Sequence, residues 1–460
     1  MSVPWIVSFY TLGCKLNQLE SESIVHAFRK EGFSIIPWGE KCHKQGNLLL
    51  LINTCTVTSK SEQKARRLIR KALKDYPEAI LIVTGCYAQM EAEVLESLDP
   101  GSSRKRLFII PGDRKNRILE LPVLLSNLNI RYQEDLLKFL AVWAKGENNP
   151  AIDDSFCFSP GEFSFHSRAF IKIQDGCDNQ CSYCRTRFAR GKSRSIAPEE
   201  ALSTLYTLEN GGYEEAVLTG VNISLYKGGQ KSMNLAELLY YLLSGTKRIR
   251  IRLSSIEPEL FNPAFVSIIS HERVRPHFHF SIQSASHNIL SRMKRSYTPE
   301  EALEGIMLLR SARDDPFLGC DIITGFPGES PKEFEKTYIF CQNIGFPGIH
   351  VFPFSRRPGT EAWNFKERVS EREAGYRVEK LVSLAQINRS IYIERWTGRT
   401  VEAIVEKGEE QHEHTVQALS ANYLKLLVSL NKKPLPKAGS LIQCKIIEKT
   451  DRFDALAEIV

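Results

Sequence analysis

Residues 169–184 read AFIKIQDGCDNQCSYC, a short apolar run followed at once by a loop with three cysteines. The run Ala169 to Ile173 has the character of a β-strand, and the loop carries Cys177, Cys181 and Cys184. Spacings of four and three residues let one loop place three thiolates on three corners of a 4Fe-4S cube. The fourth iron then has no protein ligand and is free to bind a substrate. The stretch therefore predicts a cluster site at the end of a strand.

A zinc site is the alternative for the same three cysteines. Structural zinc takes four protein ligands, and no further Cys or His follows at the spacing of a zinc ribbon or knuckle. A zinc ion would have to recruit Cys157 or His166 as its fourth ligand. We therefore expect iron-sulfur chemistry at this loop.

The whole chain has the composition of a folded protein with several domains. Its 460 residues exceed the roughly 250 to 300 that a single hydrophobic core serves, and its 42% hydrophobic and 25% charged residues are ordinary values. Eleven cysteines without a secretory signal argue against a disulfide framework and for metal or redox chemistry. No apolar run approaches the roughly 18 to 20 residues of a membrane span, so we expect a cytoplasmic protein without a membrane partner.

The cysteine loop resembles the fingerprint of the radical S-adenosylmethionine (SAM) superfamily, with Tyr183 as the aromatic residue before the last cysteine. The resemblance implies that the open iron binds the amino and carboxylate groups of SAM, and that one electron from the cluster cleaves SAM to a 5′-deoxyadenosyl radical. Five more strands are expected after the loop, with helical segments between them: Glu215 to Thr219, Arg248 to Leu253, His277 to Ser281, Leu318 to Thr324 and His350 to Phe354. With the first strand they make six βα units, the partial barrel of the superfamily.

Residues near the C-terminal ends of the barrel strands are candidates for contacts to SAM, because barrel sites lie at that end. Gly220 and Asn222 follow the second strand, and Glu257 follows the third. The Glu257 carboxylate could pair with the sulfonium or the ribose of SAM; a surface role is the alternative. The expected cofactor-binding residues are these three together with Tyr183, and the sequence singles out no catalytic side chain.

The first 125 residues alternate apolar runs with amphipathic stretches, which is the pattern of an open parallel α/β sheet. The expected strands are Ile6 to Tyr10, Leu48 to Asn53, Ile80 to Thr84 and Leu107 to Ile110. A cysteine and a helical segment follow each of the first three strands, and these cysteines are Cys14, Cys55 and Cys86. Since the carboxyl ends of parallel strands line one crevice, the three thiols should converge. Three soft ligands indicate a second metal or iron-sulfur site; the alternative is that each cysteine is only a small buried residue.

Basic residues are concentrated in two segments. The net charge of +7 is small for this length, but Lys60 to Lys71 holds six basic residues against Glu62 alone, and five of the ten positions from Arg185 to Arg194 are basic. Such runs are often only solvated helix faces, but beside cysteine motifs they favour a polyanionic partner, with nucleic acid as the first candidate. An amphipathic helix over Ser59 to Asp75 would turn its basic residues outward.

The two cluster sites and the phrases around them resemble the methylthiotransferases, radical SAM enzymes that attach a methylthio group to tRNA or to a ribosomal protein. The matching phrases are TLGCKLNQ (11–18), INTCTVT (52–58), VTGCYAQ (83–89), ARG (189–191) and GFPGE (325–329). The resemblance implies two 4Fe-4S clusters: one on Cys14, Cys55 and Cys86 that handles the sulfur, and a radical-generating one on the later cysteine triad. It also implies a tRNA partner, SAM, an electron donor and a sulfur source, the last two unidentified.

Within this family, the phrases around Cys14 and Cys55 look most like the branch that acts at C2 of N6-threonylcarbamoyladenosine, at position 37 next to the tRNA anticodon. The isopentenyladenosine branch and the ribosomal-aspartate branch are the alternatives. An alternative of another class is a non-catalytic, zinc-containing RNA-binding protein. Two stretches, Arg185 to Arg187 and Ser281 to Ser286, depart from the family pattern but spare every cluster ligand.

The expected domain order is an N-terminal α/β cluster domain (1–125), a linker (126–165) with the polar stretch Gly146 to Pro160, a radical SAM partial (β/α)6 barrel (166–393) and a C-terminal module (394–460). The C-terminal module has five period-2 runs in under 70 residues, which favour a small β-barrel, and it resembles the TRAM domain, an RNA-binding module. Its ten basic and ten acidic residues leave it neutral, so it would have to hold RNA with a local face such as Lys432, Lys433 and Lys437; a solvated loop is the alternative.

Overall fold

The structure is a computed structural model that describes residues 5–39, 47–99, 105–128, 130, 132–146, 156–407, 414–431 and 433–460. The chain divides into two compact units, and each is described by itself. Unit 1 comprises Met1–Ser164, Asp175–Asp178 and Cys184–Ser193, and unit 2 comprises Phe165–Gln174, Asn179–Tyr183 and Arg194–Val460. No helix in the described part of the chain is both long and apolar enough to cross a bilayer.

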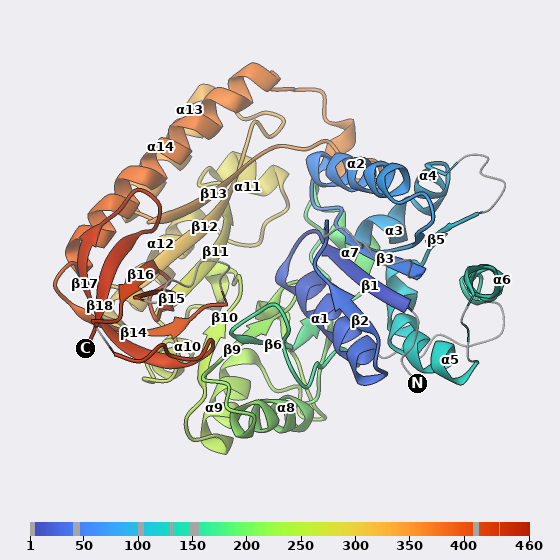
Figure 1. The fold of residues 1–460 in the computed structure, drawn as a ribbon. Coiled ribbons are helices and arrows are strands. Elements are labelled where there is room, and N and C mark those ends of the chain that lie inside the picture. The colour runs from blue at the N-terminus through green and yellow to red at the C-terminus, as the bar shows by residue number, and fades with distance from the viewer. Residues whose placement is uncertain are drawn as a thin grey trace. The chain divides into compact units, whose positions relative to one another are not determined.

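Unit 1 is built on a five-stranded parallel sheet in the order β2-β1-β3-β4-β5 (Figure 1). Its strands are β1 (Trp5–Thr11), β2 (Ser34–Ile36), β3 (Asn47–Thr54), β4 (Ile80–Gly85) and β5 (Leu107–Ile109). The strand order reverses between β1 and β3, and ligands of doubly wound sheets bind at such a switch point, outside the carboxyl ends of the strands. The expected open α/β sheet is confirmed, with the short edge strand β2 added to it.

Helices cover both faces of this sheet, which explains why β3 is a continuous apolar run. Phe28, Val7 and Leu49 belong to the core on one face, and Ile69 and Val83 belong to the core on the other. The helices of the first face are α1 (Lys15–Lys30), η1 (Gly112–Leu119), α5 (Leu121–Asn127) and α6 (Gln133–Trp143). Those of the second face are α2 (Ser59–Asp75), α3 (Cys86–Met90) and α4 (Ala92–Glu96). Helix α7 (Thr186–Arg190) also belongs to unit 1.

Part of the segment expected to be a linker is folded into unit 1. Helix α6 lies within this segment, and its Leu136, Leu140 and Trp143 are buried in the core on the first face of the sheet. The spacing of these three apolar residues is that of one helix face and was the available signal. Residues 147–155 of the polar stretch lie outside the described residues.

Unit 2 contains six parallel strands in two sheets, ordered β6-β9-β10 and β11-β12-β13. Parallel bridges from Ile251 to Val274 and from Ile256 to Phe280 connect the two sheets. The strands are β6 (Ala169–Lys172), β9 (Glu215–Thr219), β10 (Arg250–Leu253), β11 (His277–Gln283), β12 (Phe317–Thr324) and β13 (Gly348–Pro353). The helices between and after them are α8 (Pro198–Asn210), η2 (Ile223–Leu225), α9 (Leu235–Gly245), η3 (Pro258–Leu260), α10 (Pro263–Ile269), α11 (His287–Arg292), α12 (Pro299–Ala312), α13 (Pro331–Ile344), η4 (Glu361–Asn364) and α14 (Glu371–Trp396). Two-residue strands β7 (Gln174–Asp175) and β8 (Arg194–Ser195) complete the described elements before the last barrel. The predicted partial (β/α)6 barrel is confirmed.

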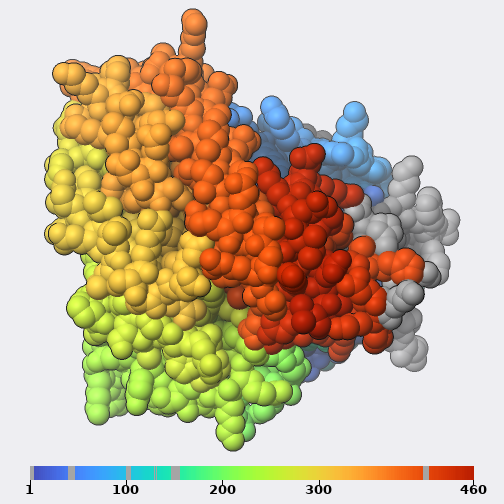
Figure 2. Space-filling view, turned by 90° about the vertical axis from the view of Figure 1, so that its left-hand side faces the viewer, coloured from blue at the N-terminus to red at the C-terminus, as the bar shows by residue number. Residues whose placement is uncertain are grey.

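The last part of unit 2 is a closed five-stranded barrel in the order β14-β15-β16-β18-β17. Its strands are β14 (Thr400–Val405), β15 (Thr415–Ser420), β16 (Lys425–Ser429), β17 (Leu441–Lys449) and β18 (Ala455–Ile459). Its core includes Phe317 of β12 and Tyr392 of α14. In Figures 1 and 2 the red barrel accordingly lies against the orange helix α14. The predicted small barrel is confirmed, and its closed form is consistent with a TRAM-like domain.

Candidate functional site

Three cysteines of unit 1 lie at the carboxyl ends of adjacent strands. Cys14 follows β1 and precedes α1, Cys55 follows β3, and Cys86 is the first residue of α3 after β4. The sheet order places β3 between β1 and β4, so the switch point lies between Cys14 and Cys55. The sequence predicts that these thiols converge, and the structure brings them to one edge of the sheet.

Two glycines allow the chain to turn sharply in front of Cys14 and Cys86. Gly13 has φ +105° and Gly85 has φ +104°, values that residues with a side chain rarely adopt. A Cβ at Gly13 would lie 2.9 Å from Cys55 Sγ, and a Cβ at Gly85 would collide with the backbone of Thr54. The two Gly-Cys pairs are therefore needed to bring the strand ends this close.

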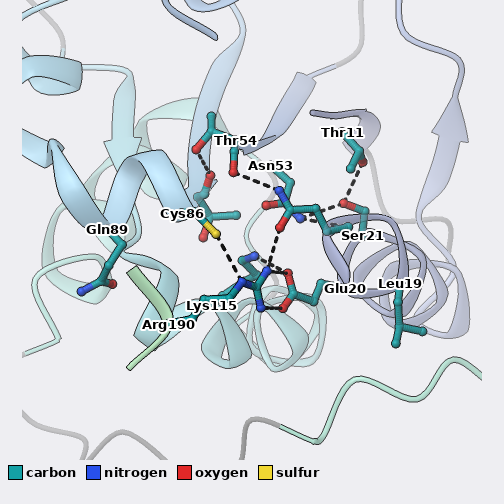
Figure 3. Close-up of polar contacts among 12 residues, drawn as sticks. Thr11, Leu19, Glu20, Ser21, Asn53, Thr54, Cys86, Gln89, Lys115 and Arg190 are labelled. Atoms are coloured by element: carbon teal, nitrogen blue, oxygen red, sulfur yellow. Dashed lines mark hydrogen bonds and ion pairs between the residues drawn. The ribbon is translucent and has the colours of Figure 1, made fainter. Parts of the chain in front are cut away.

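Buried polar side chains fasten the strand ends to one another (Figure 3). Asn17 Nδ2 donates to the carbonyl oxygens of Leu12 (2.7 Å) and Thr54 (3.0 Å). Asn53 Nδ2 donates to the carbonyl oxygen of Asn17 (3.0 Å), and Thr54 Oγ1 donates to that of Thr84 (2.6 Å). Asn17, Asn53 and Thr54 belong to the phrases around Cys14 and Cys55 that resemble the threonylcarbamoyladenosine branch. Their side chains thus fix the backbone that carries the cysteines.

A buried arginine contacts this site, and the sequence analysis did not assign it a role. Arg190, the last residue of α7, donates from Nε to Cys86 Sγ (3.3 Å) and from Nη2 to Asn17 Oδ1 (2.9 Å). Its Nη1 pairs with Glu20 (3.0 Å) and Asp175 (3.1 Å), and Figure 3 shows the guanidinium next to Cys86 and Glu20. The phrase ARG (189–191) was a signal for this residue, but it did not reveal the partner.

Positively and negatively charged side chains lie close together around the three thiols. Burial raises the pKa of Cys55 to about 11. Burial alone would lower the pKa of Arg190, but the negative charges of Cys86 and Glu20 outweigh this effect and raise it. Lys115 Nζ pairs with the second carboxylate oxygen of Glu20 at 2.5 Å. A permanent cation therefore lies beside the sulfurs, where it would stabilise the negative charge of a thiolate-bound cluster.

The three sulfurs are spaced too widely to bind one zinc ion together. Sulfur donors select zinc or iron-sulfur centres, and a tetrahedral zinc ion with Zn–S bonds of about 2.3 Å holds its sulfurs roughly 3.8 Å apart. Among the described residues, the one group of three His, Cys, Asp or Glu whose ligand atoms all lie within 4.8 Å of one another contains no cysteine. The sulfurs of Cys14, Cys55 and Cys86 therefore do not all lie within 4.8 Å of one another, and a cluster at these residues stays a prediction.

The segment around the second cysteine motif contributes further contacts within unit 1. The Cys177 N–H donates to the carbonyl oxygen of Gly191 (3.1 Å). Arg185, the residue after Cys184, pairs with Glu62 (3.3 Å) and Glu91 (2.5 Å). Arg185 belongs to a stretch that departs from the family pattern, and its buried guanidinium forms ion pairs with these two partly buried carboxylates.

In unit 2, Cys181 lies beside a buried ion pair that the sequence analysis found only in part. Arg295 donates from Nη1 to Cys181 Sγ (3.3 Å) and pairs through Nη2 with Glu257 (2.8 Å). Asn179 Nδ2 donates to both oxygens of Glu257 (3.1 and 3.2 Å). Glu257 is therefore buried and paired, which corrects the alternative of a surface role. The Tyr183 ring packs edge-on against an aromatic ring of the GFPGE phrase.

Gly220 and Asn222 form the turn after β9. Asn222 Oδ1 accepts the Ser224 N–H (3.1 Å), and the Asn222 N–H donates to Gln174 Oε1 (2.8 Å). A Cβ at Gly220 would lie 2.8 Å from the same Gln174 oxygen. These contacts fix the turn, and cofactor binding by Gly220 and Asn222 stays a prediction.

Helix α2 presents a basic surface, as predicted. Its buried side contains Ala65, Ile69, Ala72 and Leu73. Five basic side chains on its other side are exposed and form no ion pair within the described residues: Lys60, Lys64, Arg67, Arg70 and Lys71. Thr58 caps the helix by accepting the Ser61 N–H at 3.1 Å. The helix begins four residues after Cys55, so this basic surface adjoins the cysteine edge.

The remaining predicted residues belong to the C-terminal module and to the segment between the two cysteine triads in the sequence. Lys433 and Lys437 are exposed, and Lys432 lies outside the described residues. Cys157 packs against the core of unit 1, and the His166 ring contacts a neighbouring aromatic ring.

Two family models match the chain over the segments that carry the cysteine triads. The model of the radical SAM superfamily matches residues 171–341, and the model of uncharacterized protein family UPF0004 matches residues 6–103. Among solved structures, the radical SAM methyltransferase TsrM from Kitasatospora setae is similar, with a TM-score of 0.51 and 15% identity over 79% of this chain and 77% of that one. This similarity shows a shared fold.

Three relatives are similar over nearly their full length. The chain is 39% identical to threonylcarbamoyladenosine tRNA methylthiotransferase MtaB of Treponema pallidum, over 96% of this chain and 98% of that protein. It is 32% identical to the protein of the same name from Bacillus subtilis, over 96% and 94%. It is 30% identical to tRNA-2-methylthio-N(6)-dimethylallyladenosine synthase of Clostridium novyi, over 98% and 95%.

Proposed function

The chain belongs to the radical SAM methylthiotransferases, in the family of the threonylcarbamoyladenosine tRNA methylthiotransferases, and from this premise we propose that it adds a methylthio group at C2 of N6-threonylcarbamoyladenosine at tRNA position 37. It is a transferase whose radical SAM domain uses a 4Fe-4S cluster and SAM. The identity of 39% over 96% of the chain to a relative named for this substrate carries the proposal.

The proposal assigns one 4Fe-4S cluster to Cys177, Cys181 and Cys184 and a second one to Cys14, Cys55 and Cys86. A reduced radical SAM cluster supplies a 5′-deoxyadenosyl radical from SAM. The hydrogen at C2 of adenine is too weakly acidic for a side-chain base, which is why this reaction class is needed. Support for the second cluster comes from three soft donors at one sheet edge, with the permanent cation Arg190 beside Cys86.

The remaining side chains are assigned to binding. Glu257 is held in place by Arg295 and Asn179, and together with Tyr183 and the turn at Gly220 and Asn222 it is proposed to contact SAM. The basic surface of α2 is proposed to bind tRNA phosphates. An electron donor and a sulfur source complete the set of proposed partners.

The experiment is a mass-spectrometric nucleoside profile of tRNA from a strain that lacks this gene. The 2-methylthio form of threonylcarbamoyladenosine should be absent and unmodified threonylcarbamoyladenosine should accumulate. Complementation with the natural gene should restore the product, whereas the Cys55→Ala gene should not. Loss of 2-methylthio-isopentenyladenosine instead would move the assignment to the sister branch.

A further inference from the structure

Three side chains of the partial barrel form a group that the proposed reaction does not use. His279 of β11, Asp321 of β12 and His350 of β13 each offer one ligand atom, and the three atoms all lie within 4.8 Å of one another. No other trio of His, Cys, Asp or Glu in the described ranges meets this condition. The three strands are adjacent in one sheet, and the register pairs Asp321 with His350.

These side chains share the strand face that is turned away from the helices. Side chains alternate between the two faces of a strand, and the neighbours Phe280 and Cys320 are fully buried under the helical layer. His279 and Asp321 therefore point to the inner side of the barrel. A Cβ at Gly319 would collide with Nδ1 of His279, so the glycine makes room for the imidazole.

Two of the three distances within the group are close to those between ligands of one metal ion, and all three are below 4.8 Å. Asp321 Oδ1 lies 2.9 Å from His279 Nε2 and 3.4 Å from His350 Nδ1. A metal ion with bonds of about 2.1 Å and bond angles between roughly 90° and 110° holds its ligand atoms roughly 3.0 to 3.4 Å apart. Hydrogen bonds between histidine and aspartate give similar distances. The charges around the group are therefore needed to distinguish a hydrogen-bonded group from a set of metal ligands.

Asp321 has no cationic partner apart from the two imidazoles. Its side chain is 21% exposed, and no Lys or Arg of the described chain lies within 4.0 Å of its carboxylate. A largely buried carboxylate needs a compensating charge, and a metal ion held by the same three side chains would supply it. Two imidazoles and one carboxylate are the ligands of many zinc and ferrous iron sites that keep open positions. The His350 side chain is 65% exposed, so such positions would be accessible.

We propose that His279, Asp321 and His350 bind one divalent transition-metal ion, with open coordination positions for water or for an oxygen donor of a ligand inside the barrel. The site is distinct from both cysteine triads, and it does not depend on the identity of the substrate.

The test is a titration of the anaerobic, cluster-loaded protein with Mn²⁺, followed by electron paramagnetic resonance of free Mn²⁺ and by calorimetry. The cysteines are then occupied, and Mn²⁺ prefers oxygen and nitrogen ligands. About one Mn²⁺ per chain should bind, and Asp321→Asn and His350→Ala should each weaken binding at least roughly tenfold, as loss of a metal contact does. Zn²⁺ should displace the bound Mn²⁺.

The matched control is His287→Ala, which removes the imidazole of an exposed pair with Glu300 (2.9 Å) that has no third ligand. Its Mn²⁺ affinity should equal that of the natural protein. Iron content and circular dichroism check that each variant is folded, and the exposed His350 provides a folded variant should Asp321→Asn fail. Absence of Mn²⁺ binding, or binding that His350→Ala leaves unchanged, would overturn the proposal and identify the group as a hydrogen-bonded pair of histidines around Asp321.

Discussion

Arg190 is the side chain beyond the cysteines on which the N-terminal site depends most. Replacing it with methionine would break the buried ion pairs of Arg190 with Glu20 and Asp175, and breaking a buried ion pair costs about 3 to 5 kcal/mol. We expect Arg190→Met to lower the thermal unfolding temperature of the cluster-free protein and to reduce the iron content of the reconstituted protein.

Lys192→Met is the control for this prediction, because Lys192 is exposed and lies two residues further along the same segment. Lys192→Met should change neither the thermal unfolding temperature nor the iron content. Equal behaviour of the two variants would show that Arg190 is dispensable for the site.

The sequence could predict the site residues that belong to a local pattern, but not those whose role comes from a contact distant in the sequence. The cysteines at 177, 181 and 184 lie in one loop, and Cys14, Cys55 and Cys86 follow recognisable strands, so pattern alone indicated them. Arg190 and Arg295 were missed because their partners Cys86 and Cys181 lie about a hundred residues away. Neither arginine has a local signature of such a contact.

At the scale of elements, helix α2 tests the proposed tRNA surface. If its basic face binds phosphates, the double variant Lys64→Glu/Arg67→Glu should weaken tRNA binding and flatten its salt dependence, with each lost contact lowering the log–log slope by roughly 0.7 to 0.9. Fluorescence titrations at several salt concentrations measure the slope. Cleavage of SAM without tRNA should be unchanged.

Lys138→Glu on α6 is the control for the α2 variant, since Lys138 is an exposed lysine on another helix of unit 1. Its effect on the salt slope should be negligible. An unchanged slope in the α2 variant would identify that surface as an ordinary solvated helix face.

A buried carboxylate on β9 makes the partial barrel sensitive to acid. Glu215 pairs with Arg252 (2.6 Å) and Arg275 (2.8 Å). Burial alone would raise the pKa of Glu215, but the two arginines outweigh it and lower the pKa. A lowered pKa in the folded state adds stability above the ordinary pKa of about 4.5, and this stability is lost as the pH falls below it.

Glu215→Gln should therefore cost about 3 to 5 kcal/mol near pH 7, because it removes the carboxylate partner of the buried Arg252 and leaves Arg275 paired with Glu402 alone. The difference in unfolding temperature between this variant and the natural protein should stay constant from pH 7 to about pH 5 and shrink as the pH is lowered below about 4.5. The exposed Glu272→Gln serves as the control. A difference that stays constant with pH would mean that packing rather than charge is lost.

The elements that the sequence predicted well are those with long or uniform patterns. Strand β9 and helix α2 have the predicted bounds, because an apolar run and a helical period define them along their whole length. Strand β2 has three residues, too few for a period to be recognised. Helix α3 begins at Cys86 itself and not after it, because the positive φ of Gly85 lets the helix follow the strand directly.

For the whole molecule, two separate cysteine triads predict two independent clusters. Reconstituted protein should hold roughly eight irons per chain, four per cluster. Replacing Cys177, Cys181 and Cys184 with alanine should leave about half of the iron, as iron analysis and Mössbauer spectra would show. A triple variant that keeps all of its iron, or loses all of it, contradicts the two-cluster assignment.

The site geometry does not identify the substrate base, which the sequence indicated only through the resemblance of the phrases around Cys14 and Cys55. Asn17, Asn53 and Thr54, which suggested the branch, form hydrogen bonds to the backbone of unit 1. Their role in the fold is to position the cysteines. The substrate assignment therefore comes from similarity over the whole chain.

The most direct test of the account is the product that the anaerobically reduced protein makes from tRNA when it is given sulfide and SAM. It should convert threonylcarbamoyladenosine to the 2-methylthio form, and Cys55→Ala should abolish this product while 5′-deoxyadenosine is still formed. Methylthiolation of isopentenyladenosine tRNA alone, or of a ribosomal protein alone, would contradict the substrate assignment, and full product formation by Cys55→Ala would contradict the role of the N-terminal cysteines.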